Sequence, residues 1–432
     1  MRGSSTPGPN TLTADRRQIL VGAAAVATSL AAPARSQNLG PRIVVIGGGF
    51  GGANCARTIN KLNPGALVTL IEPNSIFTAP PLANAVLAGL RPIGAQQFDY
   101  SRIGEEGVTL INQYAVAVDA ASRTVTVRDG SKLGYDRLVI APGIDLRFET
   151  LPGYTPENCE TMPHCWTDGA QAVALRRQIA AMDDGGVVVI SAPVNPARCP
   201  SAPYERAAMI ACYLKAQKPR SKVIILDSKD SFTLQHQFQA AWTELYPGLI
   251  EWVGRSQGGN VTSIDVLTKT FFTDFDQIRA DVGNVIPPQK AGAIAHAAGV
   301  TDHTGWCPVD PATFASLLKP DIHVIGDAAI AGAVPKSAFA ANEEGKICAH
   351  AIVASLAGKK PAAPKLTTTC YSLLAPDYAI SSSGTYRPKD GQYAEIEGTG
   401  TSSPLVAPRS LRLQEANFAE AWYKNITREI FG

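Results

Sequence analysis

The sequence predicts an α/β fold in which a strand–helix–strand unit occurs twice and a smaller mixed unit follows. Residues 42–72 read as a strand, a glycine-rich turn, an amphipathic helix and a second strand. Residues 186–227 repeat that order without the glycine-rich turn. A short apolar strand late in the chain ends at Gly326-Asp327. With 432 residues and 45% hydrophobic content, the chain can form two or three domains that each bury a core. We therefore expect two Rossmann-type units, the first completed by the late strand, and a C-terminal α+β unit.

Residues 1–34 are expected to be a leader and not part of the fold. A polar start reaches the paired Arg16 and Arg17, and an apolar run from Val21 leads to Ala32-Pro33-Ala34, a small-residue cleavage pattern. The run is too short to span a bilayer. Paired arginines before such a run are typical of the twin-arginine export route. The sequence thus predicts an exported, periplasmic protein; the alternative is a cytoplasmic protein with an N-terminal tail.

Charge and apolar patterning exclude several classes of protein. The net charge of +2 favours neither nucleic acid nor an anionic membrane surface as a partner. Beyond the leader there is no apolar stretch long enough to cross a bilayer, so the mature chain is expected to have no membrane span. The eight cysteines and six histidines form no CxxC pair and no ligand spacing. We therefore expect no metal site.

The first unit carries the pattern of a dinucleotide-binding loop. Gly47 permits the turn out of the strand, Gly49 lets a pyrophosphate approach the backbone, and Gly52 lets the helix pack on the sheet. The phosphates would lie at the positive end of the helix, which begins near Phe50. Glu72 ends the second strand about 20 residues later, where a carboxylate accepts hydrogen bonds from a ribose. The alternative is a glycine-rich turn without a ligand.

Further candidates for cofactor binding follow these strands. Residues 73–81 form a proline-rich loop, residues 115–127 read as a hairpin, and residues 135–143 read as a buried strand that stops at a Pro-Gly turn. A carboxylate at the end of the late strand can bond ribitol hydroxyls, and a helix after Pro335 would point its positive end at a flavin ring. The candidate FAD-binding residues from these segments are Pro73, Val116, Ala141, Gly143, Gly326, Asp327 and Lys336.

The second unit has a defect at the place where a nicotinamide dinucleotide would bind. Residues 191–200 replace the expected glycine loop, contain no glycine and carry three prolines. Proline restricts the backbone and removes amide donors, so this loop cannot easily hold a pyrophosphate. We therefore expect that NAD(P)H is not the reductant. The same loop offers Cys199.

Several motifs give the chain a resemblance to a known family. It resembles the flavoprotein subunit of flavocytochrome c sulfide dehydrogenase over essentially all of its mature length. The residues that carry the resemblance are Arg198-Cys199-Pro200, Pro203-Tyr204-Glu205-Arg206, residues 285–290, residues 305–310, Pro335-Lys336-Ser337 and Thr369-Cys370-Tyr371-Ser372.

The resemblance implies a glutathione-reductase-like architecture with a defined site. It divides the chain into the leader (1–34), an FAD-binding domain in two parts (38–150 and 276–355), a degenerate NAD-type domain (151–275) and an interface domain (356–432) that docks a cytochrome c. It also implies that Cys199 and Cys370 form a redox disulfide beside the flavin and that Glu205 is an acid–base group. Sulfide would be the electron donor and cytochrome c the acceptor.

In one position the chain departs from the family pattern. The family commonly tethers FAD through a cysteine in the loop after the acidic strand, and the matching position here is Pro80. Since no cysteine lies between Ile71 and Tyr100, we expect FAD to be bound non-covalently.

Alternatives to these assignments stay open at this point. Cys199 and Cys370 can also be read as a structural bridge or as two buried thiols, and Glu205 as a solvated helix carboxylate. Two functions compete with a sulfide dehydrogenase that reduces cytochrome c. One is a sulfide:quinone oxidoreductase acting at a membrane surface, and the other is a non-catalytic flavin subunit of a sulfur-oxidising assembly.

Overall fold

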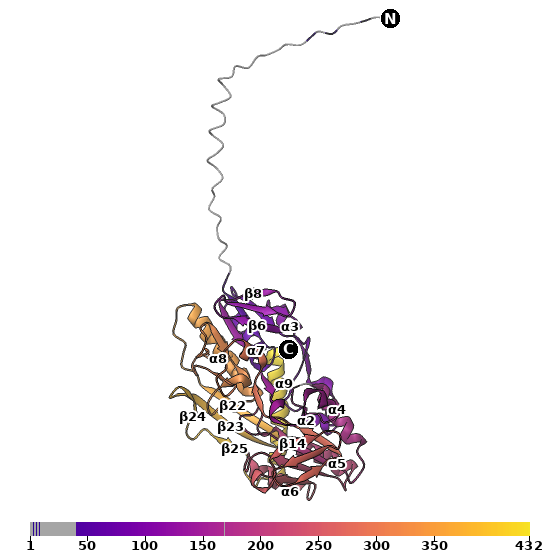
Figure 1. Ribbon diagram of the computed structural model, residues 1–432. Helices are drawn as coiled ribbons and strands as arrows, with labels where there is room; N and C mark the ends of the chain where they lie inside the picture. The colour runs from indigo at the N-terminus through magenta and orange to yellow at the C-terminus, as the bar shows by residue number, and fades with distance from the viewer. Residues whose placement is uncertain (1–2, 4–5, 7, 9–39, 168) are drawn as a thin grey trace. The chain divides into compact units, whose positions relative to one another are not determined.

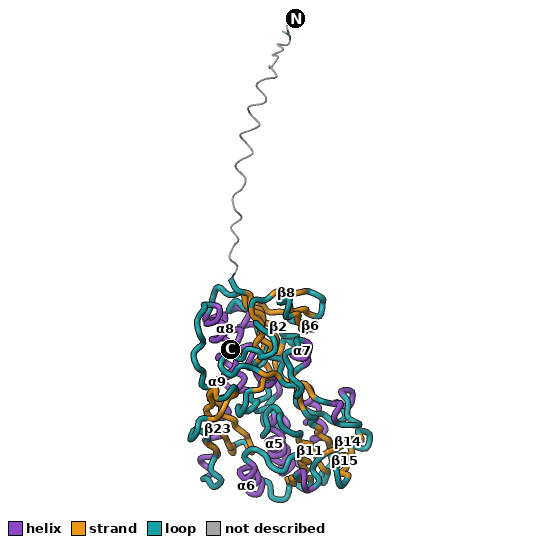
Figure 2. Tube along the Cα trace, turned by 60° about the vertical axis from the view of Figure 1, so that its left-hand side comes forward, coloured by secondary structure: helices purple, strands orange, loops and turns teal. Residues whose placement is uncertain are grey.

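The structure, a computed structural model, describes residues 40–432 except Asp168, and three isolated residues near the start, Gly3, Thr6 and Gly8. Residues 40–432 form one folded unit, which Figures 1 and 2 show from two sides. Apart from those three residues, the expected export leader lies outside the described part of the chain.

Five parallel strands form the first sheet, in the order β20, β9, β1, β2 and β5. These strands are β1 (Arg42–Ile46), β2 (Leu67–Ile71), β5 (Thr109–Ile111), β9 (Arg137–Ile140) and β20 (Ile322–Val324). Parallel strands are covered on both faces, which explains uninterrupted apolar runs such as the one in β1. The late strand β20 pairs with β9, so a distant part of the sequence completes this sheet.

Helices α1 (Phe50–Leu62) and α8 (Ala338–Leu356) pack against each other beside the first sheet. Their backbones come so close that a Cβ added at Gly345 would lie 2.5 Å from the Gly51 carbonyl oxygen. Ser337 caps α8, and its hydroxyl accepts a hydrogen bond from the Ala340 amide at 3.2 Å. The predicted helix after Pro335 is therefore confirmed.

A small antiparallel sheet follows the first βαβ unit. The hairpin predicted at 115–127 is confirmed as β6 (Ala115–Asp119) and β7 (Thr124–Val127), and β8 (Lys132–Gly134) adds a third strand. Two short strands, β10 (Ile144–Leu146) and β18 (Gln289–Ala291), pair antiparallel where the chain leaves the first unit and returns to it.

The second parallel sheet has the order β13, β12, β11 and β17. Its elements are β11 (Val187–Ala192), α5 (Ala202–Gln217), β12 (Lys222–Asp227), α6 (Gln235–Leu245), β13 (Ile250–Val253) and β17 (Val282–Val285), with α4 (Gly169–Ala181) ahead of them. An antiparallel sheet of β14 (Val261–Asp265), β15 (Thr270–Thr273) and β16 (Gln277–Arg279) is inserted before β17. The lower part of the view in Figure 2 shows these elements together around α5, α6 and β14.

The C-terminal part is an antiparallel sheet and a long helix. Strands β22 (Leu366–Ala375), β23 (Tyr378–Lys389), β24 (Gln392–Glu395) and β25 (Thr401–Ser402) precede α9 (Arg409–Phe431). Figure 1 shows the yellow helix α9 lying across the middle of the folded unit, and α9 packs against β22, β23, α1 and α3 (Ser101–Glu105). The C-terminal segment thus contributes to the core near the first glycine loop.

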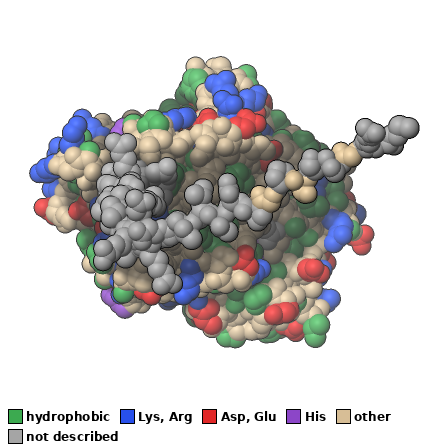
Figure 3. Space-filling view, turned by 90° about the horizontal axis from the view of Figure 1, so that it is seen from above, with side chains coloured by type: hydrophobic (Ala, Val, Ile, Leu, Met, Phe, Trp, Pro, Cys, Tyr) green, Lys and Arg blue, Asp and Glu red, His purple; other side chains and the backbone are tan. Residues whose placement is uncertain are grey.

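The remaining elements are short connections. They are β3 (Ile76–Thr78), β4 (Gln97–Asp99), α2 (Asn84–Leu87), α7 (Ala293–Ala297), β19 (Cys307–Pro308), β21 (Ala329–Ile330) and five 3-10 turns at 93–96, 148–150, 156–160, 255–257 and 326–328. On the visible part of the face in Figure 3, basic and acidic side chains are both present, in keeping with the small net charge of +2. No described helix is long and apolar enough to cross a membrane.

Candidate active site

The glycine loop of the first unit adopts a shape that side chains would prevent. Gly47 has a φ of +100°, and a Cβ there would lie 2.2 Å from the Ala141 carbonyl oxygen. A Cβ at Gly52 would lie 1.9 Å from the Gly47 carbonyl oxygen. Gly49 instead faces open space, with only a Phe77 side-chain carbon at 3.8 Å. The loop is therefore tightly built where it meets the sheet and open where a phosphate would approach the start of α1.

Glu72 is held at this loop by hydrogen bonds. The Gly48 amide donates to Oε2 of Glu72 at 2.8 Å. The backbone and side-chain nitrogens of Asn74 donate to Oε1 at 3.0 and 2.9 Å. A carboxylate has about four acceptor positions, so Glu72 keeps capacity for a ribose hydroxyl. Pro73 follows directly in the loop beside it.

Gly52→Ala is expected to abolish flavin binding because the added methyl group must displace the Gly47 carbonyl and hence the loop. Gly94→Ala is the matched control, since a Cβ at Gly94 meets no atom within 4 Å and the φ of Gly94 is not positive. Flavin absorbance of the purified protein, compared with its 280 nm band, measures the result. Full flavin content in the Gly52 variant would contradict the assignment of the loop.

Other sequence candidates for the cofactor site take different positions. The Phe50 side chain is buried and makes edge contacts with Phe77 and Phe431, with ring centres 5.5 and 6.3 Å apart. Val116 lies at a bulge in β6 with its side chain half exposed, away from the strand pairing. Ala141 follows β9, its amide bonded to the Ile46 carbonyl, and Gly143 forms a turn with a φ of +65°. The structure thus brings Ala141 beside Gly47, whereas it leaves Val116 at the outer sheet.

Asp327 and Lys336 lie together at the end of β20. The Lys336 ammonium donates to the carbonyl oxygens of Asp327 and Ala329, each at 2.7 Å, and lies 4.2 Å from the centre of the Trp306 ring. Burial raises the pKa of the Asp327 carboxyl, against the opposing charges of Arg198 and Lys336. Burial lowers the pKa of Lys336. The Gly326 amide donates a hydrogen bond to Oε2 of Glu344 in α8 at 2.6 Å.

The loop of the second unit reaches this same place. Nε of Arg198 lies 4.0 Å from the Asp327 carboxylate, and the Cys199 amide donates to the Lys336 carbonyl at 2.8 Å. Cys199 itself has a φ of +49°, a conformation that costs free energy for a non-glycine residue. The two Rossmann-type units therefore meet at Cys199.

Cys199, Cys370 and Glu205 are neighbours in the structure. The pKa of the Cys199 thiol is raised to about 12, chiefly by burial and in smaller part by Asp327, Cys370 and Glu205, while Arg198 opposes the rise. Cys370, in β22, is hydrogen-bonded to the side chains of Ser337 and Thr368, which oppose the rise of its pKa caused by burial. Both cysteines are free thiols in the structure, so the disulfide between them stays a prediction.

Glu205 is not the solvated helix carboxylate that its position in α5 allowed. Only 8% of the residue is exposed, and burial raises the pKa of its carboxyl to about 8. Hydrogen bonds with Asn84 and with the Leu373 backbone, and the charge of Arg206, oppose that rise. A carboxyl group whose pKa lies near neutrality, beside two thiols, is a candidate proton acceptor.

The site of a nicotinamide dinucleotide in the second unit is filled by protein. Asp227 ends β12, where such a site places a ribose-binding acid, but its side chain is fully buried. It accepts hydrogen bonds from Tyr204 at 2.6 Å, Trp252 at 3.0 Å and the Lys229 ammonium at 2.6 Å. The Tyr204 ring stacks on Phe232 with the centres 3.5 Å apart. This arrangement supports the expectation that the unit does not bind NAD(P)H.

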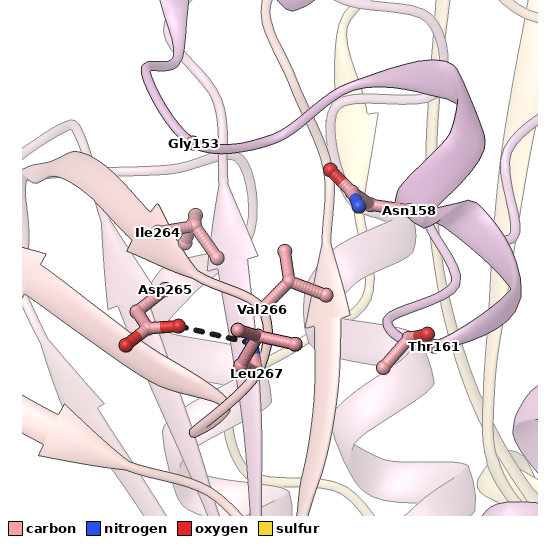
Figure 4. Close-up of a pocket in the computed structure, with 7 residues that line it drawn as sticks. All are labelled: Gly153, Asn158, Thr161, Ile264, Asp265, Val266 and Leu267. Carbon is pink, nitrogen blue, oxygen red and sulfur yellow. Dashed lines mark hydrogen bonds between the residues drawn. The ribbon is translucent and has the colours of Figure 1, made fainter.

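A pocket of about 500 Å³ (Figure 4) lies away from the candidate active-site residues, between the end of β14 and the 3-10 turn at 156–160. The Leu267 amide donates a hydrogen bond to Asp265 in the pocket wall at 3.0 Å, and the wall includes none of the candidate residues.

Within the described residues there is no group of three or more His, Cys, Asp or Glu side chains able to hold a metal ion. Cys55 and Cys348 are fully buried core residues of α1 and α8, whereas Cys212 is only partly buried.

Comparisons with known proteins identify the family. The family model "Sulfide dehydrogenase (flavocytochrome c) flavoprotein chain, central" matches residues 172–287, and "Flavocytochrome c sulphide dehydrogenase, flavin-binding" matches residues 362–431. A 45-residue segment is 53% identical to the sulfide dehydrogenase flavoprotein chain of Chlorobaculum thiosulfatiphilum; it covers 10% of this chain and 94% of that sequence. The chain belongs to the sulfide dehydrogenase flavoprotein family. The recognition made from the cysteine motifs is therefore confirmed.

The fold prediction is confirmed as well. The pyridine nucleotide-disulphide oxidoreductase model matches residues 41–190. The sulfide:quinone oxidoreductase structure of Aquifex aeolicus superposes with a TM-score of 0.69 at 18% identity, over 90% of this chain and 92% of that one. Putidaredoxin reductase, in its complex with putidaredoxin, gives a TM-score of 0.62 at 19% identity, over 88% and 93%. At such identities the likeness concerns the fold alone.

The chain is also similar in sequence to two sulfide:quinone oxidoreductases. The sulfide-quinone reductase of Aquifex aeolicus is 30% identical over 182 residues, which are 42% of this chain and 41% of that protein. The mitochondrial sulfide:quinone oxidoreductase of Dictyostelium discoideum is 20% identical over 306 residues, 66% of this chain and 65% of that protein. The match spans less than two thirds of the length of these relatives.

Proposed function

We propose that this sulfide dehydrogenase flavoprotein is an exported, FAD-dependent enzyme that oxidises sulfide to sulfur or polysulfide and passes the electrons to a cytochrome c. The observation that carries the proposal is the meeting of Cys199, Cys370 and Glu205 near Asp327, which follows β20. The Cys199 amide donates to the Lys336 carbonyl at 2.8 Å, and the side chain of the next residue, Ser337, is hydrogen-bonded to Cys370. Helix α5, which carries Glu205, packs against β22, which carries Cys370. The three residues come from a loop, from β22 and from α5. Family membership supports sulfide as the donor and a cytochrome as the partner, and the paired arginines of the leader support export to the periplasm.

The residues of the first unit fit FAD. Gly49 leaves room for a pyrophosphate at the start of α1, Glu72 has capacity for a ribose hydroxyl, and Asp327 ends β20 as a buried acceptor. Bound FAD supplies an acceptor for two electrons that can leave one at a time for a haem. Lys336 and Arg198 are the cations beside Asp327 at that end of the sheet.

The cysteine pair gives sulfide a sulfur atom to attack. Attack of HS⁻ on a Cys199–Cys370 disulfide breaks the S–S bond and leaves one persulfide and one thiolate. A second HS⁻ takes the outer sulfur as HSS⁻ and leaves a thiol. Re-forming the disulfide then releases two electrons and one proton. Each cycle thus converts two HS⁻ into HSS⁻, one H⁺ and two electrons.

The surroundings of the pair suit these steps. Cys370 lies at the capped, positive end of α8, where Ser337 and a helix N-terminus stabilise a thiolate. Glu205 is the carboxylate beside the pair that can accept the proton released when the disulfide re-forms. Its bonds to Asn84 and to the Leu373 backbone hold it in place.

A sulfide:quinone oxidoreductase is the second candidate, favoured by the match to the Aquifex protein. Such an enzyme needs an apolar segment that enters a membrane surface. Here the inward face of α9 is used in the core, with Tyr423, Ile430 and Phe431 buried, and Lys424 and Arg428 lie on its exposed side. We therefore place cytochrome c ahead of a quinone as acceptor.

Anaerobic absorbance of the FAD-loaded protein tests the proposal. Sulfide is expected to bleach the flavin band, NADH is expected to leave it unchanged, and added cytochrome c is expected to restore it faster than a soluble quinone. If sulfide leaves the flavin oxidised, the chain is a non-catalytic flavin subunit. If the quinone is the faster oxidant, the second candidate replaces the first.

The flavin is expected to be released intact by acid denaturation. The loop after Glu72 offers no cysteine between residues 71 and 100 to which FAD could be tethered. Precipitation with acid followed by absorbance of the supernatant measures the released fraction, which should approach the whole. Flavin that stays with the denatured polypeptide, located by peptide mass spectrometry, would contradict non-covalent binding.

A further inference from the structure

A narrow crevice leads to Cys199 on the side of the second unit. Its volume is about 10 Å³, and its walls include Trp166, Arg198, Cys199 and Lys229 together with prolines of the loop at 193–203. A volume of this size holds about one water-sized sphere. In a unit that binds a nicotinamide dinucleotide, the ligand lies against the loop after the first strand. Here the prolines of that loop and the buried Tyr204 leave only the crevice.

Two cations line the crevice, and each has a carboxylate partner. The Lys229 ammonium donates to the Pro193 carbonyl and to Asp227, each at 2.6 Å. Arg198 lies 4.0 Å from Asp327. Asp227 already receives hydrogen bonds from Tyr204 and Trp252 in addition to Lys229, so its negative charge is well compensated. The crevice wall therefore offers cationic groups to an anion.

Trp166 adds a hydrogen-bond donor without a partner. The residue is only 7% exposed, and among the described residues its indole N–H has no acceptor. A buried donor that lacks an acceptor costs free energy, which a bound anion would recover. The guanidinium of Arg206 lies over the Trp166 ring, 5.0 Å from its centre, and helps to hold the indole in place.

We infer that this crevice is the entrance through which hydrosulfide reaches Cys199, with Trp166 as the residue that determines specificity. The inference rests on the proposed function. Hydrosulfide has a single heavy atom and a negative charge, so it suits the small volume of the crevice, the cations in its wall and the unpartnered donor of Trp166. Organic thiols carry carbon chains that the proline and indole walls exclude. The structure thereby selects sulfide over organic thiols.

Two substitutions distinguish the effect of the Trp166 N–H as a hydrogen-bond donor from the effect of its ring as a wall of the crevice. Trp166→Phe keeps a ring and removes the N–H, so kcat/KM for sulfide-driven flavin reduction is expected to fall about tenfold, the usual effect of losing a hydrogen bond to a charged group. Trp166→Ala opens the wall, so flavin reduction by 2-mercaptoethanol is expected to rise at least about tenfold. Trp242→Phe is the matched control, because its indole N–H is also buried without an acceptor but it lies in α6 and outside the crevice.

A labelling experiment provides a readout that needs no turnover. After reduction of the FAD-loaded protein, Cys199 is alkylated with iodoacetamide or with a bulky maleimide, and the peptide is quantified by mass spectrometry. Both reagents are larger than the crevice, so both are expected to label Cys199 slowly in the parent. Trp166→Ala is expected to increase the labelling rate with each reagent, whereas Trp242→Phe is expected to leave it unchanged. Flavin content and unfolding temperature check that each variant is folded.

The outcomes distinguish this inference from the function on which it rests. If sulfide bleaches the parent flavin but both Trp166 variants behave like Trp242→Phe, in kinetics and in labelling, the entrance lies elsewhere and the proposed function stands. If sulfide does not bleach the parent flavin, both are overturned.

Discussion

Replacing Cys199 and Cys370 together by serine is expected to abolish reduction of the bound flavin by sulfide. Serine cannot form the disulfide, so HS⁻ finds no sulfur to attack and no persulfide forms. Loss of a covalent route typically costs a factor of at least about 10³ in rate. Anaerobic stopped-flow absorbance of parent and variant measures this ratio. Flavin content should be unchanged, because the glycine loop and Glu72 are untouched.

Cys212→Ser is the matched control for the double substitution. Cys212 is a partly buried thiol on α5, the helix that carries Glu205, but it belongs to the core boundary and not to the pair. Its replacement should leave the rate within a factor of about two, as for surface and boundary sites in general. Bleaching of the double variant at the parent rate would contradict the disulfide mechanism and favour direct attack of sulfide on the flavin.

Glu205→Gln is expected to change the dependence of the rate on pH. The pKa of the carboxyl is raised to about 8 by burial, so the group becomes a proton acceptor only as the pH rises through that value. The parent rate should therefore increase between pH 7 and pH 9 beyond the increase due to ionisation of sulfide itself. The glutamine variant should lack this increase and be about 100-fold slower at pH 9, as for loss of a general base. Equal pH profiles would show that Glu205 has no such role.

The same carboxyl predicts an effect on stability. Its pKa rises on folding, from 4.5 to about 8, so between these values the folded chain binds a proton that the unfolded chain does not. The free energy of unfolding should consequently fall as the pH increases from about 5 to 8. Glutamine carries no charge, so the unfolding temperature of Glu205→Gln relative to the parent should rise over this range. A constant difference would contradict the assigned pKa.

Local sequence patterns were sufficient for the framework of the first unit. Gly52 and Glu72 contact Gly47 and Gly48 in their own βαβ unit, and strand and helix periodicity located β1, β2 and α1 directly. The predicted helix of the second unit and the helix predicted after Pro335 correspond to α5 and α8 for the same reason. The proline-rich loop at 191–200 was also readable, because proline limits the backbone wherever it occurs.

The site itself depends on contacts that no local pattern contains. Glu205 lies on a helix that looks solvated in sequence, yet it is buried and hydrogen-bonded to Asn84 and to the Leu373 backbone, which are distant along the chain. Thr368 beside Cys370 and Trp166 beside Cys199 carried no sequence signal either. Arg206 and Ser337 were within the family motifs, but only the structure shows that Arg206 contacts Asn84 and that Ser337 caps α8. Val116, chosen from the predicted hairpin at 115–127, lies on an outer bulge.

The most direct test is to locate the sulfur atom during the first turnover. The oxidised, FAD-loaded protein is mixed with one equivalent of sulfide, quenched with an alkylating reagent within the time of flavin bleaching, and digested for peptide mass spectrometry. The account predicts a trapped persulfide on Cys199 or Cys370, with the other cysteine of the pair alkylated as a thiol. A bleached flavin with both cysteines still in a disulfide, or a persulfide on another cysteine, would contradict it.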